Sequence, residues 1–440
     1  MALDIGTAYL NAPMKRLVYM WIDKHMTAIL VEMNPSLSTF VAEDGRKLFL
    51  LRKALYGNED AGRLWYDVAV EFLVSKGYTV NPKDKCFYKK HTPDGQVSIL
   101  FHVDDFLAFC ESQKQLDILL DQFIKRFKKV TVQKGPKITY LGMEIESLPN
   151  QVNSISMERF TDDLIESFPV PDRAKHTPVS ANLFEIDAGS DPLNPRDSET
   201  FHSVTASLLY LSLKVRKDIG VGVAFLTGRV QEPTHQDWDK LTHLMQYIKT
   251  TRNKKLFLGG NYPDMDAELY TDASFGVHAK GNSHSGIAIK FGLGAIISKS
   301  LKQKMIAKYI TEGELVSLSD GTAMAAWVNE VMYYQGIKSP RTKIFEDNQA
   351  AIILAEAGHP TSERSRHIKV RHFFVNQFLE SKEMSIQHCK TADMIADILT
   401  KYIANPQFSK LCDLLLGYAS PVKGVRWENL PPPSVFAGFR

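Results

Sequence analysis

The sequence contains little cysteine and no apolar run long enough to cross a membrane. Its four cysteines show neither CxxC spacing nor the spacing of metal ligands: Cys86, Cys110, Cys389 and Cys412. The longest nearly apolar stretch, residues 219–228, is too short for a membrane span. The chain also lacks an N-terminal stretch of charged and then apolar residues. These absences predict free thiols and a soluble protein inside the cell, in the cytoplasm or the nucleus, with no membrane partner.

An excess of one charge sign is also missing. The 53 Lys and Arg residues nearly balance the 50 Asp and Glu residues, which leaves a formal net charge of +3. Any affinity for nucleic acid must therefore come from local patches rather than from the field of the whole protein. Basic stretches occur at residues 123–137, 298–308 and 362–372. A solvated helix face is the commoner meaning of any one of them.

Length and patterning predict a multidomain protein of mixed α+β and α/β class. Residues 1–148 combine short strands with amphipathic helices, and residues 149–265 are mainly helical around a polar, proline-containing loop at 180–199. In residues 266–405, three successive strands precede alternating helices and strands, which predicts a mixed five-stranded sheet flanked by helices. Residues 406–440, with "LPPPS", have the composition of a tail.

Two adjacent carboxylates interrupt an apolar stretch in "ILFHVDDFLAFC", residues 99–110. Burying Asp104 and Asp105 side by side is costly, because each loses hydration and the two repel one another. Residues 97–101 and 106–109 have the pattern of short strands, so the pair can lie at an exposed hairpin turn. Alternatively, a bound cation makes the pair tolerable. The local pattern leaves both explanations open.

Acidic residues also stand at the ends of other predicted strands: Asp4, Asp272 and Asp347. Strand ends converge in a sheet, so such carboxylates can form one oxygen-rich site. Carboxylate oxygens suit Mg²⁺ and Mn²⁺, and two such ions about 3.5 to 4 Å apart serve in-line phosphoryl transfer. This pattern favours metal-dependent chemistry on phosphate esters, although periodicity alone does not prove it.

Nine motifs follow one another along the chain. The first five are "DIGTAYLNAPMKRLVYM" (4–20), "LRKALYGNEDAGRLWYD" (51–67), "HVDDFLAF" (102–109), "YLGMEIE" (140–146) and "SLLYLSLKVRKDIGVGVAFLTGR" (207–229). The last four are "YTDASFG" (270–276), "EDNQAAI" (346–352), "SRHIKVRHFF" (365–374) and "IADILTK" (395–401). In this order they resemble the reverse transcriptase and ribonuclease H region of the Pol polyprotein of copia-type LTR retrotransposons, over nearly the whole chain.

The resemblance implies a partial polymerase palm in residues 1–148 and a helical thumb and connection region in residues 149–265. Because the chain begins close to Asp4, the fingers that precede this position in the family are expected to be missing. At residues 58–62 the family's usual Leu-Lys-Gln and Pro are replaced, and two of the new residues are acids, which repel phosphate. The sequence therefore predicts an eroded polymerase half.

In this half the metal triad corresponds to Asp4, Asp104 and Asp105. The resemblance implies that Asp4 and Asp104 hold two Mg²⁺ or Mn²⁺ ions, which bridge the phosphates of a dNTP and the primer 3′-OH. Tyr9 matches the aromatic residue that closes off the 2′ side of the dNTP sugar. As an alternative, Tyr9 is a core aromatic of the first helix.

The ribonuclease H half matches all four carboxylates of that family: Asp272, Glu314, Asp347 and Asp397. The resemblance implies that they bind two Mg²⁺ or Mn²⁺ ions. Glu314 also fits a capping box with Thr311 as N-cap, and Glu312 is then the alternative ligand. Asp397 competes with Asp393, which lies four residues earlier on the same predicted helix face.

A basic helix follows the Asp347 segment and completes the resemblance. Five residues are expected to contact the phosphates of an RNA/DNA hybrid: Arg364, Arg366, His367, Lys369 and Arg371. The sequence therefore predicts a retrotransposon-derived reverse transcriptase and ribonuclease H fragment that acts on RNA templates, dNTPs and hybrids. RNA-strand cleavage is favoured over RNA-directed DNA synthesis. The alternative is a non-catalytic remnant that binds nucleic acid, and the sequence leaves the oligomeric state open.

Overall fold

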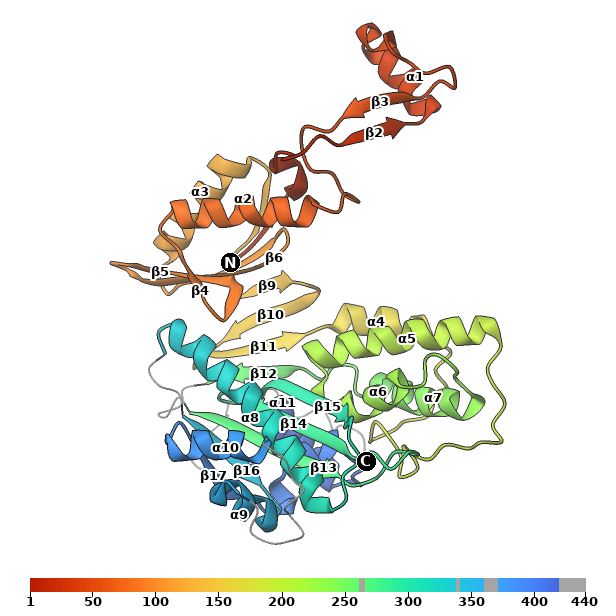
Figure 1. Ribbon diagram of the computed structural model, residues 1–440, viewed down its shortest axis with the longest axis vertical. Coiled ribbons are helices and arrows are strands. Elements are labelled where there is room, and N and C mark those ends of the chain that lie inside the picture. The colour runs from red at the N-terminus through yellow and green to blue at the C-terminus, as the bar shows by residue number, and fades with distance from the viewer. Residues whose placement is uncertain (261–265, 338–340, 360–370, 419–440) are drawn as a thin grey trace, which may run out of the picture. The chain divides into compact units, whose positions relative to one another are not determined.

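The chain divides into two compact units, Met1–Tyr140 and Leu141–Arg440, and Figure 1 traces both. The computed structural model describes residues 1–260, 266–337, 341–359 and 371–418, without the side chains of residues 371–373. Within these residues, every helix is too short or too polar to span a membrane.

The first unit is built around a six-stranded sheet in the order β4-β5-β6-β7-β1-β8. Its strands are β1 (Ala2–Ile5), β4 (Thr79–Asn81), β5 (Asp84–Thr92), β6 (Gly95–His102), β7 (Asp105–Phe109) and β8 (Val130–Gln133), and β9 (Lys137–Tyr140) ends the unit. A separate two-stranded sheet joins β2 (Tyr19–Ile22) and β3 (Lys47–Leu50). The helices are η1 (Ala8–Asn11), α1 (Lys24–Met33), η2 (Pro35–Ser38), α2 (Ala61–Ser75) and α3 (Gln113–Phe127).

Aromatic side chains of α2 and α3 pack against this sheet. The ring centroid of Phe123 in α3 lies 5.0 Å from that of Phe72 in α2 and 5.0 Å from that of Phe106 in β7. The apolar residues of both helices recur at three- and four-residue spacing, which gathers them on one buried face. The structure confirms the two helices and the β6–β7 hairpin that the sequence predicts.

The second unit contains a mixed five-stranded sheet in the order β15-β14-β13-β16-β17. Its strands are β13 (Ala267–Ser274), β14 (His284–Lys290), β15 (Ala295–Lys302), β16 (Thr342–Glu346) and β17 (Met384–His388). The first three pair antiparallel, and β13, β16 and β17 pair parallel. This arrangement confirms the predicted mixed sheet. The unit also has an antiparallel sheet of β10 (Met143–Leu148), β11 (Val152–Ser156) and β12 (Leu256–Gly259).

Helices accompany both sheets of the second unit (Figure 1). The α-helices are α4 (Glu158–Glu166), α5 (Pro195–Lys214), α6 (Gly220–Thr227), α7 (His235–Thr250), α8 (Ile310–Tyr334), α9 (Gln349–Ala357), α10 (Arg371–Glu380) and α11 (Gln407–Leu416). The 3-10 helices of its described residues are η3 (Lys217–Ile219), η5 (Thr391–Asp393) and η6 (Ile395–Leu399). The mixed α/β class predicted from the sequence is therefore correct.

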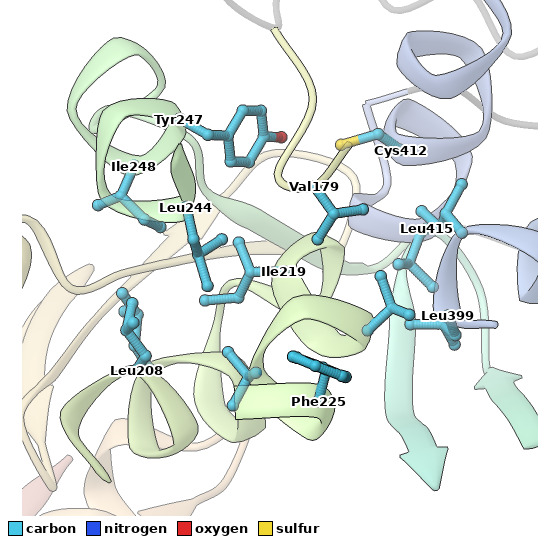
Figure 2. Close-up of a cluster of buried hydrophobic side chains, with 14 of the residues drawn as sticks. Val179, Leu208, Ile219, Phe225, Leu244, Tyr247, Ile248, Leu399, Cys412 and Leu415 are labelled. Carbon is cyan, nitrogen blue, oxygen red and sulfur yellow. The ribbon is translucent and has the colours of Figure 1, made fainter. Parts of the chain in front are cut away.

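One hydrophobic core joins segments that the sequence analysis assigns to three different domains. Figure 2 shows Leu208 of α5, Leu244 of α7, Leu399 of η6 and Leu415 of α11 among its side chains. Residues 149–265 and 266–405 thus belong to one compact unit rather than two. Residues 407–416 are a buried helix and not part of a tail, because their apolar residues recur at helical spacing and find partners in this core.

A buried ion pair stands beside this core. The Arg216 guanidinium donates to both carboxylate oxygens of Asp218, from Nε at 3.0 Å and from Nη2 at 2.8 Å. Arg216 also donates to the carbonyl and hydroxyl of Thr251 in the loop after α7, and the Tyr247 hydroxyl donates to Asp218 at 2.6 Å. The side chains of Arg216 and Asp218 are 2% and 0% exposed. Their geometry therefore satisfies two charges that water does not reach.

Two candidate carboxylate sites

Three carboxylates meet at one edge of the five-stranded sheet. Asp272 lies on the central strand β13, Asp347 directly follows the neighbouring parallel strand β16, and Glu314 comes from α8. One ligand oxygen of each residue lies within 4.8 Å of those of the other two. Parallel strands end at the same edge, which explains why residues 75 positions apart in sequence become neighbours. Asp272 and Glu314 are 2% and 4% exposed.

The close packing of α8 on the sheet directs Glu314 into this group. The Ser317 hydroxyl donates to the backbone carbonyl of Asp272 at 2.9 Å, and a Cβ at Gly321 would lie 2.8 Å from the Thr271 side chain. Residues 314, 317 and 321 follow helical spacing and share one face. The face of α8 that carries Glu314 is therefore held against β13.

The predicted capping box at the start of α8 is wrong. Tyr309 is the N-cap, in extended conformation and without a side-chain cap, so Glu312 rather than Glu314 occupies the third helical position. Glu312 accepts a hydrogen bond from the backbone N–H of Lys308 at 2.6 Å. Of the two alternatives, Glu314 joins the carboxylate group and Glu312 stabilises the helix start.

Asp397 lies beside the three carboxylates but is not one of them. The predicted helix that would place Asp393 and Asp397 on one face is replaced by two 3-10 helices, η5 and η6. Asp393 is exposed and pairs with Lys410 at 2.7 Å. Asp397 is buried and pairs with Lys401 at 2.8 Å, and the same ammonium lies 3.5 Å from Asp272. The structure thus brings Asp397, and not Asp393, next to Asp272.

Crowded negative charge dominates the electrostatics of this site. Burial, followed by the charges of Glu346, Asp272 and Asp347, raises the pKa of Glu314 to about 11. Burial and the neighbouring Asp272 raise the pKa of Asp397 to about 7. Burial also lowers the pKa of the Lys401 ammonium, but the charges of Asp272 and Asp397 outweigh this and hold it above its usual value.

Several residues that were not predicted from the sequence support the group. Glu346 is buried, accepts a hydrogen bond from the Thr271 hydroxyl at 2.8 Å, and has its pKa raised to about 8, mainly by burial. The Thr400 hydroxyl donates to Asp272. Two sequence signals indicate these residues. The alternation along β16 places Glu346 on the same buried side as Ile344. The motif "ADILTK" ends with Thr400 and Lys401.

The carboxylate oxygens of Asp272, Glu314 and Asp347 are suitable ligands for a divalent cation. Among the described residues this is the one group of three or more potential metal ligands close enough to share an ion. Its oxygens are hard ligands of the kind that Mg²⁺ and Mn²⁺ take. Glu314 Oε2 is buried and has no hydrogen-bond partner within the protein, which leaves its lone pairs available.

The second group of acids lies in the Met1–Tyr140 unit. Asp4 of β1 stands directly opposite Asp105 of β7, and the Ile5 N–H donates to the Asp104 carbonyl at 3.1 Å. Burial, followed by the charges of Asp104 and Asp4, raises the pKa of Asp105. The predicted triad is therefore brought together. Among the described residues, however, it does not form a set of three carboxylate oxygens as close as that around Asp272.

The turn before Asp105 has an unusual backbone. Val103 and Asp104 form the loop between β6 and β7, and Val103 has a φ of 56°, in the left-handed region that β-branched residues rarely adopt. The indole N–H of the buried Trp65 donates to the Val103 carbonyl at 2.6 Å. Tertiary packing thus holds a strained turn that positions Asp104, as is common where a fold orients functional groups.

Tyr9 lies on η1, half-buried, with its ring centroid 4.6 Å from that of Tyr56. Tyr56 is 57% exposed. Burial, followed by the charges of Asp104, Tyr9 and Asp4, raises the pKa of Tyr56. Both rings therefore border the acids, and Tyr9 is not a fully buried core residue. Tyr56 was not predicted as a site residue, although it lies within the motif of residues 51–67.

The predicted phosphate contacts cannot be placed. Arg364, Arg366, His367 and Lys369 lie outside the described residues, and Arg371 begins α10 with its side chain also outside them. Their role in nucleic-acid binding stays a prediction.

A buried hydrogen-bond chain supports η6 from the side of β14 and β15. His278 Nε2 lies 3.0 Å from His284 Nδ1, and His284 Nε2 lies 2.7 Å from the Ser300 hydroxyl, which donates to the Leu399 carbonyl at 2.7 Å. Because Ser300 donates its proton to Leu399, His284 must donate from Nε2. A neutral His284 then accepts at Nδ1 from His278 Nε2, and burial favours this neutral form.

The preference of the folded state for neutral histidines predicts acid sensitivity. Burial, followed by repulsion from Lys302, lowers the pKa of His278 to about 4, and burial, followed by repulsion from His278, lowers that of His284 to about 3. A histidine whose pKa is lower in the folded protein than in the unfolded chain contributes its full stabilisation above the unfolded pKa of about 6.5. This stabilisation is lost as the pH falls toward the pKa of the folded state, because the unfolded chain then binds more protons. The midpoint temperature of thermal unfolding of the metal-free protein should therefore decrease as the pH is lowered from about 6.5.

Two variants isolate this effect. His284→Gln should flatten the pH dependence between about pH 6.5 and 4.5, whereas His202→Gln, at an exposed position of α5, should keep it. Equal pH dependence in the wild type and in His284→Gln would assign the acid sensitivity to other groups.

Comparison with known proteins places these sites in context. Residues 1–181 match the family model described as reverse transcriptase (RNA-dependent DNA polymerase). The retrovirus-related Pol polyprotein from transposon TNT 1-94 of Nicotiana tabacum is 25% identical over 95% of this chain and 31% of its own length. The corresponding protein from transposon RE1 of Arabidopsis thaliana is 27% identical over 81% of this chain and 24% of its own length. The transposon Ty1-DR5 Gag-Pol polyprotein of Saccharomyces cerevisiae is 23% identical over 93% of this chain and 23% of its own length.

The chain thus spans less than a third of the length of these relatives. Among solved structures, LC11-RNase H1, isolated from compost, aligns over 33% of this chain and 97% of its own, with 12% identity and a TM-score of 0.24. That score is too low to assign the fold. Residues 1–181 therefore match the reverse transcriptase family, and most of the chain is similar to part of the Pol polyproteins of these transposons.

Proposed function

We propose that the Leu141–Arg440 unit cleaves the RNA strand of RNA/DNA hybrids in a ribonuclease H-type reaction. The observation that carries this proposal is the convergence of Asp272, Glu314 and Asp347, whose ligand oxygens lie within 4.8 Å of one another. Their position at one edge of a mixed five-stranded sheet, next to an unpaired buried oxygen of Glu314, supports a site for divalent ions and phosphate.

Two Mg²⁺ or Mn²⁺ ions are the proposed cofactors, held by Asp272, Glu314 and Asp347 with Asp397 alongside. When bound, such ions polarise the scissile phosphate and lower the pKa of an attacking water. The protein's own groups prepare the site. Lys401 offsets the charges of Asp272 and Asp397, and the Thr400 hydroxyl holds one oxygen of Asp272 in place.

The hybrid substrate also needs cationic contacts. We assign them, as part of the proposal, to the basic segment that contains Arg364, Arg366, His367, Lys369 and Arg371. Guanidinium and ammonium groups neutralise backbone phosphates without reading sequence, which suits an enzyme that cleaves hybrids of any sequence.

Hybrid cleavage tests the proposal directly. The protein should cleave the RNA strand with Mg²⁺ or Mn²⁺ and stop when the metal is chelated. Asp347→Asn should abolish cleavage, because the amide keeps the shape of the side chain but removes the charge that attracts the ion. Asp393→Asn is the matched control, since Asp393 is exposed and paired with Lys410 outside the site. Full cleavage by Asp347→Asn would remove this residue from the site.

RNA-directed DNA synthesis by a polymerase palm is the second candidate, favoured by the match of residues 1–181 and by the pairing of Asp4 with Asp105. DNA synthesis ranks below RNA cleavage because, among the described residues, the acids of the Met1–Tyr140 unit are less tightly grouped than those around Asp272. Primer extension on an RNA template should therefore be undetectable under conditions that give full hybrid cleavage. Robust extension that Asp104→Asn abolishes would reverse this order, and Tyr9→Ala should then relax the exclusion of ribonucleotides.

A further inference from the structure

Two adjoining cavities follow the edge strand β15, and none of the three carboxylates lines either of them. One has a volume of about 740 Å³ and lies between β15 and the helices α5 and α6. The other has a volume of about 620 Å³ and lies between β15 and α8. Leu213, Ser298 and Lys299 line both, so the two cavities meet along β15. Each volume is typical of ligand-binding pockets.

Basic side chains gather along this path. Lys280, Lys299 and Lys302 line the larger cavity, and no described carboxylate forms an ion pair with any of the three. Arg229 lines it as well, but Asp237 already binds its guanidinium at 3.0 Å. The described lining of this cavity contains no acidic residue. Its excess positive charge favours an anionic ligand.

The smaller cavity adds a buried cation. Lys217 is 4% exposed, and its ammonium donates to the Leu213 carbonyl at 2.7 Å but pairs with no described carboxylate. Burial, followed by repulsion from Lys299 and Lys214, lowers the pKa of Lys217 to about 8. A buried ammonium without a counter-ion is costly, and an anion bound in the cavity would relieve this cost.

An aromatic side chain completes the smaller cavity. Trp327 of α8 lines it and is 44% exposed, next to the apolar side chains of Ile297 and Met324. Asp320 also lines it and already has an interaction within the protein. An exposed indole beside lysines is the combination that binds single-stranded nucleic acid, since bases stack on the ring while the cations contact phosphates.

We infer that these two cavities form a second nucleic-acid site, which binds a single strand along β15. Bases stack on Trp327, and the phosphates lie against Lys299 and Lys302 with Lys217 beneath. The inference rests on the proposed function of this unit as a nucleic-acid enzyme. It adds a strand path separate from the carboxylate group, since neither cavity is lined by Asp272, Glu314 or Asp347.

Binding of a labelled single-stranded oligonucleotide of about 12 nucleotides, measured by fluorescence anisotropy in EDTA at several salt concentrations, tests this site. Lys299→Ala/Lys302→Ala should weaken binding and reduce the slope of log affinity against log salt by about 1.4, since each phosphate that is no longer neutralised lowers it by roughly 0.7. Lys304→Ala/Lys308→Ala removes the same charge from exposed positions outside both linings and should change the slope much less.

Trp327→Ala provides a second, different signature. Without the stacking interaction the affinity should fall about tenfold with the salt slope unchanged, and Trp327→Phe should recover part of this affinity. The thermal unfolding midpoint of each variant shows whether it is folded. Unchanged binding in folded Trp327→Ala and Lys299→Ala/Lys302→Ala would overturn the inference, and so would displacement of the strand by an acidic peptide at lower concentration than by unlabelled oligonucleotide.

The design separates this inference from the proposed function. Binding is measured without metal, so Asp347→Asn should bind the single strand as the wild type does even though it does not cleave. If hybrid cleavage is absent but the two signatures appear, the strand site stands and the proposed function fails. If cleavage occurs but neither signature appears, the proposed function stands and the strand site does not.

Discussion

Replacing Asp218 by alanine should lower the free energy of unfolding of the Leu141–Arg440 unit by about 3 to 5 kcal/mol, the usual cost of leaving one partner of a buried ion pair behind. Arg216 would keep its charge at a side chain that is 2% exposed, and among the described residues the Thr251 oxygens alone would still accept its protons. The Tyr247 hydroxyl would lose its acceptor as well. Urea or guanidinium unfolding, followed by circular dichroism, measures the change.

Two comparisons show whether the destabilisation comes from the unpaired charge. Asp172→Ala breaks the pair with Lys249, but Asp172 is 99% exposed, so stability should hardly change. Arg216→Met/Asp218→Leu removes both charges and should be less destabilised than Asp218→Ala alone, since no ion remains buried without a partner. An Asp218→Ala protein as stable as the wild type would show that the pair is not critical to this fold.

Replacing Glu314 by glutamine should reduce hybrid cleavage by roughly a thousandfold or more, because metal-ion catalysis contributes several kcal/mol and each 1.36 kcal/mol is tenfold in rate. Glutamine keeps the volume of the side chain and is uncharged, as is the protonated carboxyl that the raised pKa of Glu314 favours without metal. We therefore expect the metal-free variant to unfold at no lower temperature than the wild type. Single-turnover cleavage and thermal unfolding of the same preparations measure the two effects.

Glu312→Gln is the matched control, two residues away on the same helix. Its amide oxygen can still accept the hydrogen bond from the Lys308 N–H, so both helix start and cleavage should be retained. Loss of cleavage in Glu312→Gln with normal activity in Glu314→Gln would mean that the first turn of α8 rearranges when metal binds, and the assignment of Glu314 would fall.

Much of the framework follows from local pattern. The alternation of apolar residues predicted the strand that carries Asp272 and the strand that Asp347 follows. The parallel pairing of β13 with β16, from Ala267 opposite Thr342 to Tyr270 opposite Phe345, places their ends together. Apolar residues at three- and four-residue spacing likewise predicted the amphipathic helices α2 and α3. The roles of the carboxylates as metal ligands stay predictions, as does every role assigned to the basic segment around Arg366.

By itself, the sequence determined which carboxylates stand at strand ends and the succession of strands and helices that builds the five-stranded sheet, because these depend on residues adjacent along the chain. Tertiary structure alone decided between Glu314 and Glu312, since the conformation of Tyr309 sets where α8 begins. It alone separated Asp397 from Asp393 and buried α11, whose apolar face meets the core formed by α5 and α7. Burial depends on partners that are distant in sequence, and no local pattern contains them.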